Sequence, residues 1–103
     1  MAGLCYEDLV PGLTVEHPIR RTVTEMDNIL FLGLTYSCAP IHIDAEYAKH
    51  TIFGKQILNS MFLFALINGI TVIDTTIGTT LGNLGYEEIK FPRPVFHGDT
   101  IVS

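Results

Sequence analysis

Hydrophobic and polar positions alternate over residues 14–23, where β-branched side chains are interleaved with polar ones. This alternation predicts a strand, and Pro18 inside it favours an edge position or a bulge because proline has no backbone N–H to donate. Thr24 and Asp27 then have the spacing of a helix start whose side chains cap backbone amides, although Glu or Gln is commoner at the last position. Apolar residues continue the expected helix to about Thr35.

The middle of the chain predicts two further helices. Asp44 is a favourable first cap for a short helix over residues 45–49. Asn59 or Ser60 can cap a longer helix, which ends at about the last residue of the uncharged stretch 57–73. A membrane span usually needs about 20 apolar residues, and this stretch is shorter and interrupted by polar side chains. We therefore interpret it as a core helix that the protein encloses on most sides.

Residues 79–91 return to a strand pattern, in which Gly82 and Gly85 indicate a bulge or a close backbone approach. After a turn, residues 100–103 have the composition of another strand. This order predicts a single α+β domain over residues 1–103, with an antiparallel sheet wrapped around the long helix. Because the sequence stops just after that strand begins, we expect the last strands of the domain to be missing.

The composition narrows the choice of partners. Hydrophobic residues make up 48% of the chain and charged residues only 17%, so we expect apolar surface to be buried in a homodimer or a larger homo-oligomer. A net charge of −5 argues against nucleic acids and anionic membranes. Cys5 and Cys38 form no zinc or redox motif, and the N-terminus lacks the features of a signal peptide, which together predict a cytoplasmic protein.

The richest candidate chemistry lies between Tyr36 and Asp44. His42 and Asp44 are two residues apart in a segment with an extended pattern, where side chains at this spacing point to the same side. We expect both to face one cavity, and histidine suits proton transfer near neutral pH. A metal site formed by these two residues and His50 matches no recognised ligand spacing, so no metal is expected.

Several motifs together carry a family likeness. They are Tyr36-Ser37-Cys38-Ala39-Pro40-Ile41-His42-Ile43-Asp44, Thr51-x-Phe53-Gly54, Ile57-x-Asn59-Ser60-Met61 and Phe91-Pro92-Arg93-Pro94-Val95-Phe96-x-Gly98-Asp99-Thr100. In this order the chain resembles the MaoC-like dehydratases, which are (R)-specific enoyl-CoA hydratases of the hot-dog fold. The resemblance implies an acyl-CoA substrate, no cofactor beyond the CoA of that substrate, and a dimer. Residues 74–79 and 83–85 look most like the branch that includes mesaconyl-CoA hydratase (β-methylmalyl-CoA dehydratase), which acts on branched dicarboxylic acyl-CoAs.

The resemblance also implies roles for individual residues. His42 matches the family's catalytic histidine, whereas Ser37 stands where the family has its catalytic Asp. Ser37 would orient a water molecule, because its hydroxyl does not ionise near neutral pH. Asp44 would either orient His42 or cap the following helix.

The start of the long helix is expected to hold the thioester. Asn59 and Ser60 stand where the family has a His-Gly pair. The free backbone amides of Ser60 and Met61 would stabilise the thioester oxygen as an oxyanion hole.

Two other functions remain open from the sequence. One is a hot-dog acyl-CoA thioesterase, and the other is a catalytically idle acyl-CoA-binding or partner subunit, which the serine at position 37 favours. His17 and His50 are expected to be solvated, His97 to be structural, and Cys38 to be a small packed residue.

Overall fold

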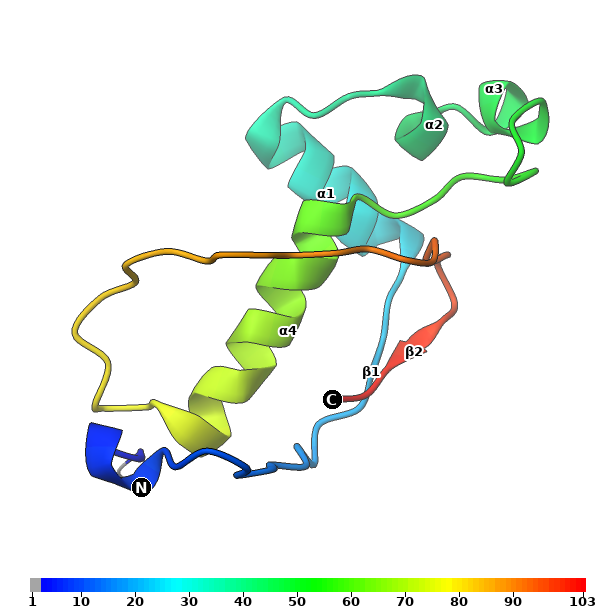
Figure 1. Cartoon of the computed structure of the whole chain (residues 1–103). Helices are drawn as coiled ribbons and strands as arrows, with labels where there is room; N and C mark the ends of the chain where they lie inside the picture. The colour runs from blue at the N-terminus through cyan, green and yellow to red at the C-terminus, as the bar shows by residue number, and fades with distance from the viewer. Residues whose placement is uncertain (1–2) are drawn as a thin grey trace.

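A computed structural model describes residues 3–103 and shows one long helix with shorter elements around it (Figure 1). In chain order these are the 3-10 helix η1 (Tyr6–Asp8), strand β1 (Arg21–Thr22), helices α1 (Glu25–Thr35), α2 (Pro40–Ile43), α3 (Ala45–Lys49) and α4 (Ser60–Thr75), and strand β2 (Thr100–Ile101). Figure 1 shows α4 in the middle of the molecule, with α2 and α3 beyond its N-terminal end.

Helix α1 begins with a reciprocal cap, as the sequence predicts. The Asp27 amide donates to the Thr24 hydroxyl over 3.1 Å, and the Thr24 amide donates to the Asp27 carboxylate over 2.8 Å. Asp27 therefore completes the capping box despite its short side chain. It also receives two hydrogen bonds from the Arg21 guanidinium, at 2.9 and 2.7 Å. The first turn of α1 is thus fastened to β1.

The segment around His42 is helical, so the expectation of an extended strand there is wrong. Pro40 is the first residue of α2, a position that proline suits because its missing N–H would have no helical partner. His42 lies inside this helix, and the Asp44 carboxylate instead accepts from the Tyr47 amide over 3.0 Å as the cap of α3. His42 and Asp44 consequently do not form the same-side pair that an extended segment would give.

Helix α4 begins at its predicted cap, Asn59, and ends two residues later than expected, at Thr75. Its expected enclosure is wrong, because only Leu63 and Ile70 of its side chains are buried. Within residues 3–103 the sheet has only two strands, so it does not cover the other faces of α4. No helix in this range is both long and apolar enough to span a membrane.

The sheet consists of β1 and β2, which pair antiparallel with Arg21 opposite Ile101 and Thr22 opposite Thr100. The strand expected to open at residue 100 is therefore confirmed. Of the strand expected over residues 14–23 only β1 forms, and no strand forms over residues 79–91. A strand needs a neighbour to take its backbone hydrogen bonds, and residues 79–91 have no such neighbour in the described part of the chain.

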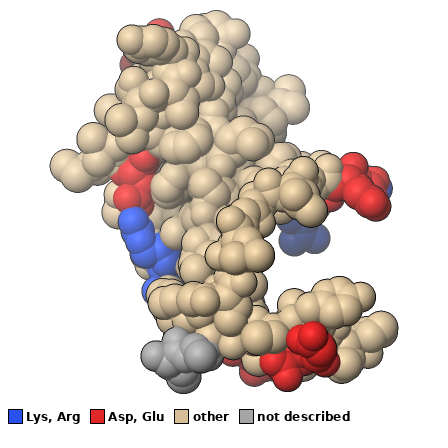
Figure 2. Space-filling model, turned by 90° about the vertical axis from the view of Figure 1, so that its left-hand side faces the viewer, with Lys and Arg blue, Asp and Glu red and all other residues tan. Residues whose placement is uncertain are grey.

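The buried core is small and lies between the sheet and α4. Val23, Leu58 and Leu63 form it, with partly buried Phe62, Leu66, Val95 and Ile101 packed against them. The radius of gyration is 16.2 Å, whereas a compact domain of this length has about 13 Å. Uncharged atoms cover most of the face in Figure 2, and charged side chains gather in a few separate places. Many large apolar side chains are open to solvent, including Tyr36, Leu81 and Leu84.

The side chain of His17 is buried, which corrects the expectation that it is solvated. Its side chain is 6% exposed, and its Nδ1 lies 2.8 Å from the Asp74 carboxylate near the end of α4. The His17 amide donates to the Ser103 carbonyl over 2.9 Å. This residue therefore joins the segment before β1 both to the long helix and to the residues after β2.

Asp27→Asn should destabilise the protein at neutral pH and flatten its acid sensitivity. The Arg21 guanidinium, the main cause, together with the bonds from Thr24, lowers the pKa of Asp27 from 3.8 to about 2. A lowered carboxyl pKa adds stability above pH 4 that is lost as the pH falls toward 2. We expect a loss of about 1 kcal/mol at pH 7, because the half-exposed guanidinium is screened by water.

Urea unfolding at pH 7 and at pH 2 to 4 measures this effect. The variant and the parent should converge at the acid end. An equal difference between them at every pH would contradict the assignment.

Candidate functional site

Asn59 organises the N-terminal end of α4 with both ends of its side-chain amide. Its Oδ1 accepts from the amides of Met61 and Phe62, at 2.8 and 3.3 Å. Its Nδ2 donates to the Ser37 hydroxyl oxygen over 3.1 Å. Asn59 is 8% exposed, and its three bonds are partly buried. The structure thus brings together two expected site residues that lie 22 positions apart in the sequence.

Asn28, which the sequence analysis missed, connects this helix end to the segment of His42. Its Oδ1 accepts from the Asn59 amide over 3.1 Å, and its Nδ2 donates to the His42 carbonyl over 3.0 Å. It is 3% exposed. Asn28 is four residues before Leu32, so both lie on the buried face of α1. An amide side chain at such a position is the sequence signal that could have found it, because a buried amide needs partners.

His42 is half-buried, and it is held by hydrogen bonds to Gln56 and Ile57, which lie just before α4 in the sequence. Its Nδ1 lies 2.8 Å from the Ile57 carbonyl, and its own carbonyl accepts from the Gln56 side chain over 2.9 Å. Because a carbonyl oxygen can only accept, Nδ1 carries the proton of the neutral ring. Nε2 is then left with a free lone pair, which is the state that a general base requires.

The amides at the start of α4 differ in what they can bind. The Met61 amide is engaged by the Asn59 cap, so the expectation that it serves an oxyanion is not favoured by this geometry. The Ser60 amide has no hydrogen-bond partner among residues 3–103. It lies at the positive end of a helix of 16 residues, which favours a negatively charged oxygen.

Two cavities flank this helix end. One, of about 300 Å³, is lined by Phe31, Thr35, Ser37, Asn59 and Met61. The other, of about 210 Å³, is lined by Phe53, Ile57, Ser60, Phe91, Pro92, Arg93 and Pro94. His42 lines neither cavity but is bonded to Ile57, which lines the smaller one. Asp44 also lines neither and serves as a helix cap.

No three His, Cys, Asp or Glu side chains gather in a way that suits a metal ion within the part of the chain that the structure describes. The candidate groups at this helix end are amides, the Ser37 hydroxyl and the His42 imidazole. Ser37 and Ser60 line different cavities and His42 lines neither, so the described residues do not place all three around one cavity. Such a set can hold an oxyanion, orient a water molecule and transfer a proton.

Asn28→Ala should lower the free energy of unfolding by about 2 kcal/mol, because the buried Asn59 amide would lose its acceptor. Urea denaturation measures the change. Asn68→Ala, at an exposed position of α4, is the matched control and should change stability by less than about 0.5 kcal/mol. Equal effects of the two substitutions would contradict a structural bridge at Asn28.

Comparisons with known proteins identify the family. The model of the MaoC like domain matches residues 8–103. The mesaconyl-CoA hydratase of Cereibacter sphaeroides is 31% identical over 100 residues, which cover 97% of this chain and 29% of that protein. The (R)-specific enoyl-CoA hydratase of Rhodospirillum rubrum is 29% identical over 102 residues, which cover 95% of this chain and 65% of that protein. The chain thus spans less than two thirds of the length of these relatives.

A solved structure from Archaeoglobus fulgidus, described as a monoamine oxidase regulatory protein, has the same fold. It superposes with a TM-score of 0.86 at 36% identity, covering 99% of this chain and 69% of that one. The α+β hot-dog class expected from the sequence is thereby confirmed. Because the family model extends over nearly the whole chain, this protein belongs to the MaoC-like domain family.

Proposed function

We propose that the protein is an acyl-CoA hydratase or dehydratase, which adds water reversibly to an α,β-unsaturated acyl-CoA thioester. The observation that carries this proposal is the hydrogen bond from His42 Nδ1 to the Ile57 carbonyl, because it leaves Nε2 free to act as a base. The names of the relatives, an enoyl-CoA hydratase and a mesaconyl-CoA hydratase, support the same reaction.

The reaction needs a base for water and a partner for developing negative charge. His42 Nε2 takes a proton from water as the water oxygen bonds to Cβ, a step worth about 10²–10⁴-fold in rate. The electron pair of the double bond moves toward the thioester oxygen, which the free Ser60 amide stabilises at the positive end of α4. The protonated His42 then returns its proton to Cα, which completes the addition of water.

Ser37 orients the attacking water molecule and does not act as a base. Its oxygen accepts from Asn59 Nδ2, so its own O–H remains available to donate to the water oxygen. Asn59 contributes indirectly, since it fixes both Ser37 and the first turn of α4. Asp44 has the supporting role of capping α3. Met61 lines the cavity that also contains Ser37, and its backbone amide does not bind the substrate.

The acyl group that we propose is a branched dicarboxylic one. The resemblance of residues 74–79 and 83–85 to the mesaconyl-CoA hydratase branch supports it, as does the 31% identity to such an enzyme. We also propose a homo-oligomer in the cytoplasm. Large apolar side chains on α1 and α4, including Leu34 and Met61, are exposed and would be covered by a second copy.

A non-catalytic acyl-CoA-binding subunit is the second candidate. The observation that favours it is Ser37 itself, because no carboxylate occupies the place of the family's catalytic acid. The thioesterase alternative is less favoured, since Asp44, the carboxylate nearest in sequence to His42, is used as a helix cap.

His42→Ala should lower kcat/KM for hydration by about 10²–10⁴-fold, because it removes the base. The loss of absorbance of crotonyl-CoA and mesaconyl-CoA measures the rate, and His50→Ala, at an exposed position, is the matched control. Retention of most of the activity in the His42 variant would refute the assignment. Release of free thiol by the parent protein would instead indicate a thioesterase.

Ser37→Ala should lower kcat about tenfold with little change in KM, because one hydrogen bond to the attacking water is lost. Steady-state kinetics with crotonyl-CoA measure both constants. A variant with unchanged kcat would show that Ser37 only supports Asn59 and does not orient the water.

A further inference from the structure

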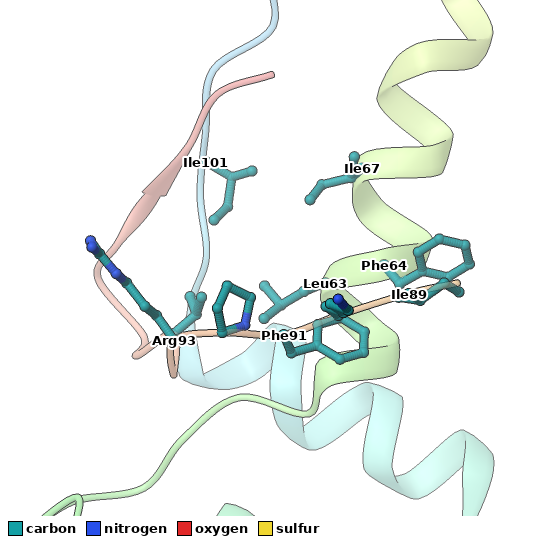
Figure 3. Close-up of a pocket in the computed structure, with 10 residues that line it drawn as sticks. Leu63, Phe64, Ile67, Ile89, Phe91, Arg93 and Ile101 are labelled. Atoms are coloured by element: carbon teal, nitrogen blue, oxygen red, sulfur yellow. The ribbon is translucent and has the colours of Figure 1, made fainter. Parts of the chain in front are cut away.

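Arg93 lies where two cavities meet. It lines the 210 Å³ cavity that also contains Ser60, and it lines a second cavity of about 290 Å³ between α4 and the chain before β2. Phe91, Pro92 and Arg93 form the wall that the two cavities share. The walls of the larger one are mainly apolar side chains from α4 and from residues 89–95, as Figure 3 shows.

Arg93 has no anionic partner among the residues that the structure describes. Most other cations of the chain do have one or are stacked on a ring: Arg21 on Asp27, Lys49 on Glu46, Lys90 on Glu88, and Lys55 over Phe96 at 4.2 Å. Within residues 3–103 Arg93 makes neither a salt bridge nor a hydrogen bond, although the protein carries a net charge of −5. Arg20 is unpaired in the same sense but lines a different cavity, beside His17.

The backbone of Arg93 is restricted before any ligand arrives, whereas its side chain is exposed. Pro92 and Pro94 flank it, and proline fixes its own φ while restricting the residue before it to extended conformations. The backbone at this position therefore loses less conformational entropy when the side chain binds a ligand. Figure 3 shows the guanidinium directed away from the apolar side chains, so its hydrogen-bond donors lie outside the apolar part of the cavity.

We propose that Arg93 binds anionic oxygens of the thioester substrate at the cavity that Ser60 lines. A guanidinium offers two parallel donors, a geometry that both carboxylate and phosphate oxygens match. Two parts of the substrate can supply such oxygens: a carboxylate on the acyl group, or a phosphate of the CoA carrier. This assignment rests on the proposed function, since it takes an acyl-CoA as the ligand.

Binding of saturated analogues tests the proposal without requiring turnover. Isothermal titration calorimetry of Arg93→Gln is compared with the parent and with Arg20→Gln, using butyryl-CoA, methylsuccinyl-CoA and the pantetheine thioesters of the same two acyl groups. Loss of a charge-assisted pair should weaken binding about 10- to 100-fold for every ligand that carries the recognised anion. Arg93→Lys should recover part of the affinity, and Arg20→Gln should bind as the parent does.

The pattern across the four ligands identifies the anion. Weaker binding of both methylsuccinyl thioesters alone assigns the acyl carboxylate, and weaker binding of both CoA thioesters alone assigns the carrier phosphate. Unchanged affinity for all four, or an equal loss that includes the uncharged butyryl-pantetheine, would overturn the proposal. If Arg93→Gln weakens binding of the anionic ligands while the parent shows no hydration, the catalytic proposal fails and the anion site stands.

Discussion

The buried side-chain amide of Asn28 joins the two parts of the candidate site, together with the bonds that Gln56 and Ile57 make to His42. Its oxygen holds the backbone of Asn59 at the start of α4, and its nitrogen holds the backbone of His42 in α2. The Asn28 side chain is buried, where an unpaired polar group is costly, so a shift of either segment that breaks these bonds is unfavourable. Asn28, which lines neither of the two cavities beside this helix end, thus helps to set the position of the imidazole relative to the Ser60 amide.

The same helix end offers hydrogen-bonding groups that carry no formal charge. Asn59 satisfies two amides of α4 and leaves the Ser60 amide open, so the helix end has one directed donor rather than several. A backbone carbonyl, not a carboxylate, fixes the tautomer of His42. The side chains of Asn28 and Asn59 and the Ile57 carbonyl, which position these groups, carry no formal charge.

Features that depend on neighbours in the sequence could be predicted, and those that depend on distant partners could not. The caps at Thr24, Asp44 and Asn59 are local, so the starts of three helices followed from the sequence. The expected strand over residues 79–91 failed because pairing needs a second chain segment. Residues 40–43 look extended by pattern, yet Pro40 starts a helix there. The role of Asn28 could not be predicted, because it depends on contact with Asn59, which is 31 positions away in the sequence.

The contact between His17 and Asp74 has a consequence for the order in which the chain folds. It closes a loop of 57 residues, and β1 reaches β2 across an even longer stretch of sequence. Closing long loops costs entropy before any contact repays it, whereas the helices need only local bonds. We therefore expect α1 and α4 to form early. The contact of His17 with Asp74 and the pairing of β1 with β2 should form last.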